Sequence, residues 1–466
     1  MEKTEEIKRS VNSKRLSGLD FLVEKLWKLE EHNTNAKTEI LAGITTFITM
    51  AYIMFVNPII LKETGMNAGA VFVATCLSAA IGTLMMAFYA NYPFAQAPGM
   101  GLNAFFTYTV VLTMGYTWQE ALAAVFFSGI IFILITISGL REMIVDSIPM
   151  SLKYAVSGGI GLFIAFIGLK NAGIIVPNQA TYIGFGNLTE PATLLAIGGL
   201  FITAILMSKN IKGSILLGIL ITTVLGIFVG IVKLPDGFTL MKMPPSIAPT
   251  FLKLDIKGLL GIGKNVAVIS VITSFLYVVL SFTFVDLFDT IGTFIGTGSK
   301  AGMLDKNGKM PNMKKGLLSD AIATTVGSLI GTSTVTTYVE SAAGIAEGGR
   351  TGLTALTTGI LFLIALFFSP IALLVPTQAT APALIIVGVL MMGSIKNINF
   401  DDFTEAMPAF LAIAVMPFTF SIANGIAAGL IAYPIVKLAA GKAKEIHPIV
   451  YILAFLFILR FATLAG

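Results

Sequence analysis

Charged residues are scarce in this chain. They make up 12% of its 466 residues, whereas hydrophobic residues make up 56%; soluble domains carry about 25% charged residues. Apolar runs of about 18 residues or more, a length that crosses a bilayer, follow one another from Ile40 nearly to the C-terminus. This pattern favours one large membrane domain over the roughly three soluble domains that the length alone would suggest.

Cysteine and histidine are scarcer still. The single cysteine, Cys76, excludes an internal disulfide framework and a cysteine-cluster metal site. The two histidines, His32 and His447, lie outside the apolar runs, so a proton path through the membrane would have to use carboxylates. The net charge of +5 is modest and sits in the loops, which suits a lipid bilayer better than a nucleic-acid partner. We expect no cofactor.

The first 39 residues are predicted to form a cytoplasmic N-terminus. They are polar and carry no short apolar stretch with a cleavage site, so a signal peptide is not expected. Residues 16–30 place leucines at helical spacing, with lysines among them, and these leucines are Leu19, Leu22, Leu26 and Leu29. The spacing predicts an amphipathic helix, either lying at the membrane surface or packed on the protein.

The apolar runs predict an all-α polytopic membrane protein with about 14 transmembrane spans. The spans are expected near 40–61, 68–90, 97–114, 120–140, 149–172, 190–208, 212–232, 267–298, 317–331, 340–347, 352–374, 381–395, 406–422 and 425–440. The third opens on a Pro/Gly-rich stretch and the tenth is too short to cross alone, so both are predicted to be broken. Irregular backbone at membrane depth is tolerated only where it is buried or lines a cavity.

Loop charges predict that the N-terminus is cytoplasmic, because basic residues gather after the even-numbered spans. These residues are Arg141, Lys153, Lys209, Lys212, Lys300, Lys306, Lys309, Lys314, Lys315 and Arg350. The loop at 233–264 also carries lysines yet should lie outside, which long loops tolerate. A last apolar run, 448–464, contains Arg460 and does not fit the alternation. It is either a peripheral helix or a fifteenth span.

A weak internal repeat divides the chain. Ile148-Pro149 opens span five and Ala381-Pro382 opens span twelve, and a broken span precedes each. Seven spans in each half would invert the topology, as in secondary transporters with discontinuous helices. The predicted parts are the N-terminus (1–39), a first inverted repeat (40–232), an extracytoplasmic loop (233–266), a second inverted repeat (267–440) and a C-terminal segment (441–466).

Acidic residues deep in the apolar segments are the strongest functional signal. Span eight contains Asp286 and Asp289, and the broken tenth span contains Glu340. A central acid costs roughly 2.5–3.5 kcal/mol on membrane-insertion scales, so such residues are functional by default. A structural hydrogen bond between helices is the alternative. Asp286 precedes Asp289 by about one helical turn, and holding the site together would account for it equally well.

Two polar stretches beside these acids resemble extended arms. Residues 331–338 are rich in threonine and β-branched residues, and residues 94–99 lead into Asn103. Each would be a short strand followed by a half-helix, whose free backbone N–H groups could meet ligand acceptors. A kinked but otherwise ordinary helix is the alternative.

Motifs for other chemistry are weak. The sequence contains neither H-E-x-x-H nor G-x-S-x-G, and residues 258–265 approach a phosphate-binding loop but end in Asn265 where Ser or Thr is needed. We therefore expect no enzyme activity. Glu347 and Arg350 are expected to form a solvated cytoplasmic pair. The remaining acids of that side are expected only to solvate a loop, and they are Asp401, Asp402 and Glu405.

Four separated segments carry a family likeness. They are GITTFITMAYIMFVNP (43–58), QAPGMGLNAF (96–105), VDLFDTIG (285–292) and GTSTVTTYVESAAGIAEGGRTG (331–352). Together they resemble the guanine/hypoxanthine permeases, the AzgA-like branch of the nucleobase transporters, and the likeness spans most of residues 40–460. The more distant uracil and xanthine carriers share only the outline.

The resemblance implies proton symport of purine nucleobases in the cell membrane by a fold of two inverted repeats. Spans one to four and eight to eleven would form a core, and the other spans a gate that commonly dimerises. Glu340 would bind the base, Asp289 would bind it or couple the proton, and Asp286 is a second candidate for proton coupling. The remaining residues that would line the site are Tyr338, Val339, Gly99, Met100 and Asn103.

Several alternatives stay open. An anion transporter of the same architecture is disfavoured because the deep acids would repel its substrate. A channel fits the paired broken spans less well than alternating access does. An intramembrane enzyme is disfavoured because the sequence shows no metal-ligand cluster and no nucleophile–base pair. The expected preference is for guanine and hypoxanthine, whose N1–H can donate to a carboxylate, and an adenine-preferring purine permease is the remaining alternative.

Overall fold

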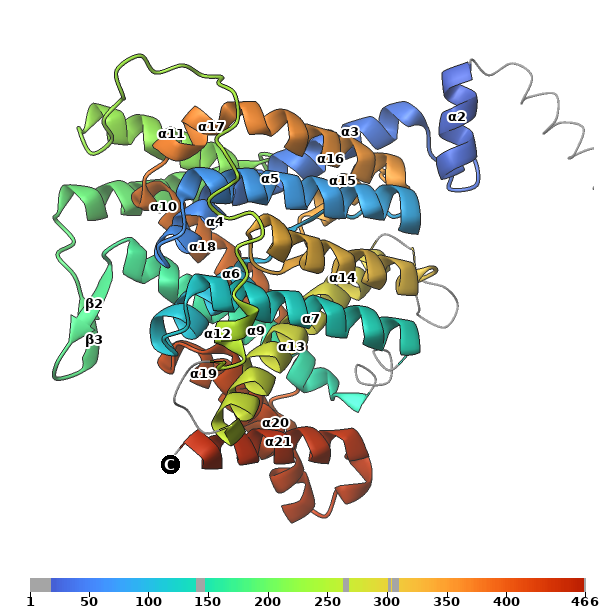
Figure 1. Ribbon diagram of the computed structural model, residues 1–466, viewed down its shortest axis with the longest axis vertical. Helices are drawn as coiled ribbons and strands as arrows, with labels where there is room; N and C mark the ends of the chain where they lie inside the picture. Colours follow the sequence, from blue (N-terminus) through green and yellow to red (C-terminus); the bar gives the residue numbers. More distant parts are fainter. Residues whose placement is uncertain (1–17, 140–146, 263–267, 301–302, 304–309, 465–466) are drawn as a thin grey trace, which may run out of the picture.

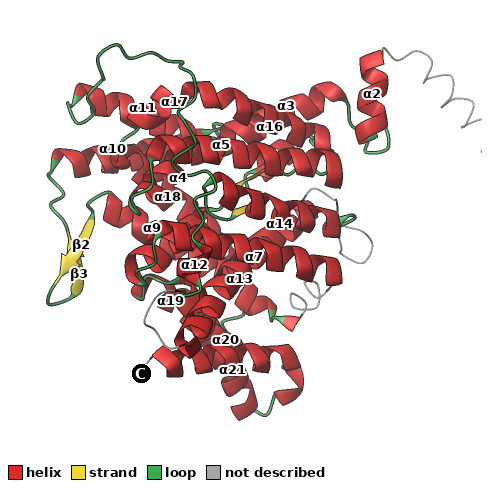
Figure 2. Ribbon diagram, viewed as in Figure 1, coloured by secondary structure: helices red, strands yellow, loops and turns green. Residues whose placement is uncertain are grey.

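The structure is a computed structural model that describes residues 18–139, 147–262, 268–300, 303 and 310–464. Parts of the charged loops lie outside the described residues: 1–17, Arg141, Lys306, Lys309 and, at the end of the long loop, 263–267. The described chain is a bundle of helices with two short two-stranded sheets (Figure 2). This confirms the predicted all-α polytopic fold.

The first half of the chain forms helices and short strands in this order: α2 (Gly18–Trp27), α3 (Ala36–Met50), α4 (Ile53–Lys62), α5 (Ala68–Met85), η1 (Met86–Ala90), β1 (Gln96–Pro98), α6 (Met100–Ala104), η2 (Phe105–Thr113), α7 (Trp118–Ser138), α9 (Met150–Asn171), β2 (Ile175–Asn178), β3 (Tyr182–Phe185), α10 (Pro191–Ser208), α11 (Ser214–Phe228) and α12 (Ile256–Leu259). Strands β2 and β3 form an exposed hairpin that joins α9 to α10. Helix α12 is a single turn within the long loop.

The second half contains α13 (Val268–Lys300), α14 (Met313–Ile330), β4 (Val335–Thr337), α15 (Ser341–Ala346), α16 (Gly352–Ala365), η3 (Leu366–Phe368), α17 (Ser369–Leu374), α18 (Thr377–Met392), η4 (Gly393–Asn397), α19 (Phe403–Phe418), α20 (Ile422–Ala439), η5 (Ala443–Glu445) and α21 (Pro448–Leu464). In the described part of the chain, 8 helices are long and apolar enough to cross a membrane, and shorter apolar helices accompany them. The count of about 14 spans stays a prediction.

Contacts between the helices define two groups. In one group α16 lies against α3 and α5, α14 lies against α5 and α7, and α13 lies against α7. In the other, α9 packs along α18 and α19, α19 packs along α20, and α10 contacts α11 and α18. Segments far apart in the sequence therefore interleave, which is the arrangement expected when two halves of a chain are related by an inverted repeat.

Two predicted spans differ in detail from the observed helices. Within the predicted first span, 40–61, α3 ends at Met50 and α4 begins at Ile53. Ala51 and Tyr52 form a turn whose backbone stays in the right-handed helical region, so Ala36–Lys62 continues as one candidate span. Pro382 was expected to open span twelve but lies inside α18, which begins at Thr377. A proline ring can be accommodated inside a membrane helix where neighbouring groups satisfy the freed carbonyl.

The N-terminal helix α2 is tied to the bundle at one end. Trp27 is buried with Leu29 and Leu353, and its indole N–H donates to the carbonyl of Ala87 at 3.0 Å. Leu22 and Leu26 of the same helix are each 54% exposed. The predicted amphipathic helix is thus present within 18–27, with its last turn packed on the protein and two leucines directed outward.

Helix α21 lies beside α20 at one edge of the molecule, next to the C-terminus (Figure 1). It also contacts α13, where the rings of Phe284 and Phe457 lie 6.5 Å apart. Several of its apolar side chains are exposed, among them Ile452 and Phe455, as expected for a helix in contact with lipid. The choice between a peripheral helix and a fifteenth span stays open.

The expectation of a solvated Glu347–Arg350 pair is wrong. Glu347 pairs instead with Lys212, at 2.5 Å between Nζ and Oε1. The Arg350 guanidinium donates to the carbonyls of Ile345 and Gly349 at the end of α15. Basic side chains near a helix C-terminus hydrogen-bond the last carbonyls in this way. Both side chains therefore fix the turn that follows the tenth span.

The acids near the start of α19 also do more than solvate a loop. Asp402 caps α19 by accepting from the Thr404 N–H, and its hydrogen bond with Lys442 holds the pKa of that carboxyl well below its usual range. Glu405 accepts from Lys437, whose side chain is 1% exposed, at 2.6 Å. Lys437 also pairs with Glu445 at 2.6 Å. The sequence could not indicate this cluster because Glu405 lies near the start of α19 and Lys437 near the end of α20, so only the packing of the two helices brings them together.

Candidate functional site

Two short strands from opposite halves of the chain pair inside the helical bundle. Strands β1 and β4 are antiparallel, with Gln96 opposite Thr337 and Pro98 opposite Val335. All residues of both strands are buried, and Figure 2 draws them in yellow among the helices. The sequence favours extended backbone here because β4 consists of β-branched residues and because Pro98, which lacks an N–H, is disfavoured in a regular helix. The predicted strands in spans three and ten are confirmed.

Each strand leads directly into a half-helix. Gly99 connects β1 to α6, and its N–H donates to the Thr334 carbonyl at 3.0 Å. A Cβ at Gly99 would lie 2.4 Å from Thr336, so only glycine allows the strands to approach this closely. Glu340 stands at the N-cap position of α15. The first residues of both half-helices therefore lie next to the strand pair.

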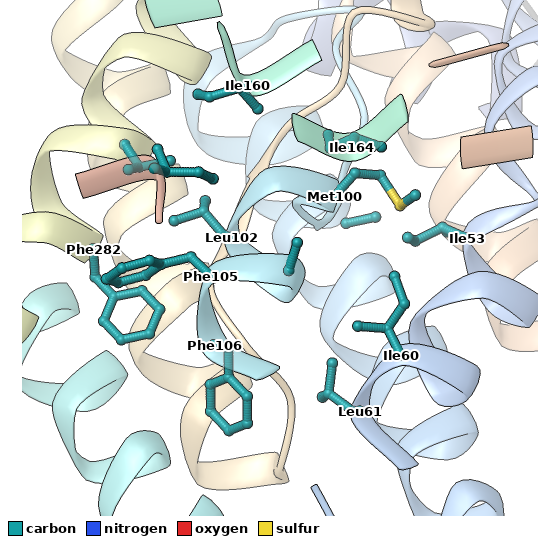
Figure 3. Packing of buried hydrophobic residues seen from close by; sticks show 14 of the residues in the cluster. Ile53, Ile60, Leu61, Met100, Leu102, Phe105, Phe106, Ile160, Ile164 and Phe282 are labelled. Carbon is teal, nitrogen blue, oxygen red and sulfur yellow. The ribbon is translucent and has the colours of Figure 1, made fainter. Parts of the chain in front are cut away.

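The predicted site residues of span three lie where the two strands pair and the two half-helices begin, which we call the strand crossing. Asn103 is buried; its amide donates to the Pro98 carbonyl at 3.4 Å, and its carbonyl accepts from the Ser333 hydroxyl. Met100 is 6% exposed, and Figure 3 shows it between Ile53 and Ile164. Asn103 therefore joins the arm before β4 to the half-helix after β1.

Apolar side chains also pack the end of the half-helix α6 against α13. Phe105 lies edge-to-face against Phe282 of α13, with ring centroids 4.9 Å apart, and Figure 3 shows Leu102 and Phe106 beside this pair. Such an aromatic pair contributes about 0.5–1.5 kcal/mol beyond the area that it buries. The packing holds α6 against the helix that carries the two aspartates.

The predicted residues of span ten take different positions. Tyr338 is 5% exposed and its hydroxyl donates to the Pro98 carbonyl at 2.6 Å, so it ties β4 to the end of β1. Val339 is 50% exposed. Glu340 is half-buried, and its Oε1 accepts from the Tyr52 hydroxyl at 2.5 Å. Glu340 is thus a carboxylate held at the edge of the strand pair with part of its surface accessible.

A chain of hydroxyl groups joins the two aspartates of α13. Asp289 is half-buried, and its Oδ2 lies 3.5 Å from the Thr336 hydroxyl. The Thr336 and Thr290 hydroxyls lie 2.8 Å apart. The Thr290 hydroxyl in turn lies 3.4 Å from Oδ1 of Asp286, which is fully buried. The two aspartates are therefore connected through threonines, with Asp289 nearer the accessible edge.

A fourth carboxylate, Asp320 of α14, was missed by the sequence analysis. It is fully buried, and its Oδ1 accepts from Thr290 at 2.9 Å and from Thr337 and Gln96 at 3.3 Å. It therefore links α13 with both strands. It was overlooked because it stands in the first turns of an amphipathic stretch that also contains Lys314 and Lys315. Its apolar surroundings, Leu-Leu-Ser-Asp-Ala-Ile-Ala, were the available signal.

Tyr52 was missed as well. It occupies the break between α3 and α4 and is 1% exposed. The only signal in the sequence was its place inside the 43–58 motif. No periodicity in that motif distinguishes this tyrosine from its apolar neighbours.

Carboxylate oxygens dominate the chemistry of this crossing. Two hydroxyls, those of Thr336 and Thr290, link Asp289 to Asp320. Like charges at such a site favour the retention of a proton by one of them. Among the described residues no group of His, Cys, Asp and Glu could hold a metal ion. The arrangement can accept N–H donors from a small molecule and can exchange a proton.

Paired half-helices that meet within the bundle, with carboxylates at the crossing, define an inverted-repeat membrane transporter. The fold is similar to the solved transmembrane domain of a cyanobacterium bicarbonate transporter, BicA, with a TM-score of 0.61 and 16% identity over 83% of this chain and 97% of that chain. Residues 37–428 match the profile described as the Permease family, Xan_ur_permease. The chain belongs to this family.

Curated relatives match nearly the whole chain. It is 47% identical over 439 residues to the adenine permease AdeP of Escherichia coli (strain K12), covering 94% of this chain and 96% of that protein. It is 46% identical over 440 residues to the guanine/hypoxanthine permease PbuO of Bacillus subtilis (strain 168), covering 93% and 99%. The predicted resemblance to guanine/hypoxanthine permeases is confirmed. The protein is a multi-pass membrane permease and not an enzyme.

Proposed function

We propose that this protein carries purine nucleobases, guanine and hypoxanthine in particular, into the cell together with protons by alternating access. The observation that carries the proposal is Glu340, a half-buried carboxylate held beside the paired strands at the start of α15. The names of relatives such as PbuO support the substrate class. The protein would lie in the cell membrane with its N-terminus in the cytoplasm, and dimerisation through the gate helices would accord with the family likeness.

Base recognition would follow from the chemistry of a carboxylate. An ionised carboxylate only accepts hydrogen bonds. Hypoxanthine and guanine carry an N1–H donor, whereas adenine presents a lone pair at N1. A buried group left unpaired costs about 1–3 kcal/mol, and more when it is charged, which corresponds to a discrimination of about tenfold or better. Glu340 is the direct ligand in this proposal, with Val339 and Met100 beside it.

Proton coupling would use the aspartates. Asp289 faces the accessible edge, and the Thr336–Thr290 pair connects it to the buried Asp286. Repulsion from neighbouring acids favours a protonated state at this crossing. In this proposal Asp289 loads the proton and Asp286 supports it. Gly99, Asn103 and Tyr338 position the two half-helices, because their hydrogen bonds join the arms of the strand pair.

Adenine is the second candidate substrate. The relative named adenine permease AdeP is as similar to the chain as the guanine/hypoxanthine permease PbuO is. Glu340 could also meet the imidazole edge of the base, and every purine carries an N–H donor there. The alternative of an anion transporter is supported only by the similarity in fold to the bicarbonate transporter, at 16% identity. The acids at the crossing would repel an anion.

Competition for uptake tests the proposal. Cells that lack their own purine carriers and express the protein take up labelled hypoxanthine, and guanine, adenine, uracil and xanthine are added as competitors with and without a protonophore. We expect guanine to compete strongly, adenine at least about tenfold more weakly, and the protonophore to abolish accumulation. Equal competition by adenine would refute the proposed orientation of the base. Accumulation that survives the protonophore but collapses without sodium would refute proton coupling.

A further inference from the structure

Tyr52 lies at the turn where the two helices of the first span meet. Helix α3 ends at Met50 and α4 begins at Ile53, so Tyr52 lies in the turn between them. Its ring belongs to the main hydrophobic cluster, and the residue is 1% exposed. The hydroxyl nevertheless reaches Glu340, which lies 288 residues further along the chain. A buried ring with its hydroxyl directed at a site carboxylate has little freedom to turn away.

The contact between these two side chains is short. The Tyr52 hydroxyl donates to Oε1 of Glu340 at 2.5 Å, within the range of charge-assisted O–H···O⁻ hydrogen bonds, which are about twice as strong as neutral ones. A carboxylate has two oxygens that can accept parallel donors. Tyr52 therefore engages one of the two oxygens that a base with two parallel donors would need.

We propose that Tyr52 determines base selectivity by occupying Oε1 of Glu340, so that the site favours bases with one N–H donor on the bound edge. The inference rests on the proposed purine transport. Hypoxanthine donates one N1–H, which Oε2 can accept. Guanine adds a parallel exocyclic amine, which has to share Oε1 with the tyrosine hydroxyl or displace it. Because Oε1 already accepts from the Tyr52 hydroxyl, it is a weaker acceptor for the second donor of guanine, which therefore contributes less than it would at a free oxygen.

Tyr52→Phe removes the hydroxyl and keeps the ring. Inhibition constants of guanine, hypoxanthine and adenine are measured against uptake of labelled hypoxanthine in the wild type and the variant. The expected result is a rise of roughly fivefold or more in the preference for guanine over hypoxanthine, since a hydrogen bond to a charged group becomes available to the amine. The adenine-to-hypoxanthine ratio should change less than about twofold, because neither base has two parallel donors on that edge.

Tyr108→Phe is the matched control. The Tyr108 hydroxyl also donates to a glutamate, Oε1 of Glu63 at 2.7 Å, but this pair lies apart from the strand crossing, so the guanine-to-hypoxanthine ratio should not change. A merely structural role of Tyr52 would lower transport of all bases equally and leave the ratios unchanged, and that result would overturn the inference. If uptake by Tyr52→Phe is too low, competition for hypoxanthine binding to the purified protein gives the same ratio. A wild type that binds no purine would instead refute the proposed function.

Discussion

Asp320 is predicted to hold the strand pair together. Its Oδ1 accepts from Thr290, Thr337 and Gln96, which belong to α13, β4 and β1. A hydrogen bond to a charged acceptor contributes about 1 kcal/mol more than a neutral one. Asp320→Asn keeps the shape and removes the charge, so it should lower the free energy of unfolding by about 3 kcal/mol if the three contributions add. Asp320→Ala should cost more, because it leaves the buried Gln96 amide without this acceptor.

Thermal or chemical unfolding of the purified protein in detergent measures this loss, and binding of labelled hypoxanthine to the same samples follows the site. Asp401→Asn is the control, since Asp401 is exposed and a surface substitution of this kind changes stability by less than about 0.5 kcal/mol. We expect Asp401→Asn to be as stable as the wild type, Asp320→Asn to be less stable, and Asp320→Ala to be the least stable. Binding of hypoxanthine should be weaker in the two Asp320 variants. Unfolding of Asp320→Ala at the wild-type temperature would show that this carboxylate does not hold the strands.

Two further predictions concern other buried charges. Asp289→Asn should abolish or uncouple hypoxanthine uptake and Asp286→Asn should reduce it less, because Asp289 is nearer the accessible edge. Uptake at matched membrane expression measures both effects. A more severe loss in Asp286→Asn would show that Asp286, and not Asp289, carries the proton. Lys437→Met should lower the free energy of unfolding by about 1.5–3 kcal/mol, because Glu405 loses a charged partner but is 21% exposed and keeps hydrogen bonds from Ser151 and Tyr433. Glu445→Gln, at a carboxylate 52% exposed, should cost less than about 1 kcal/mol. Equal melting temperatures of the two variants would contradict this.

Apolar runs and local motifs predicted the helices and the two broken spans because these features depend on neighbouring residues. Thr-rich residues before Glu340 and the Pro98-Gly99 pair indicated extended arms, and the arms do pair as β1 and β4. Deep acids in strongly apolar runs, such as Asp289, were also visible from composition alone.

Contacts between segments far apart in the chain could not be predicted from the sequence. Nothing local shows that Tyr52 meets Glu340 or that Asp320 meets Gln96, because each pair is joined only by the folding of both halves. Lys437 appeared to be an ordinary basic residue at a helix end, where lysine is common, and its two acidic partners emerge only from packing.

Proton movement driven by the substrate tests the central claim most directly. The purified protein is placed in liposomes that contain a pH-sensitive dye, and hypoxanthine is added outside with no ion gradient imposed. We predict that the interior acidifies as labelled hypoxanthine enters, and that Glu340→Gln abolishes both signals. Entry of hypoxanthine without acidification, driven instead by an imposed sodium gradient, would contradict it.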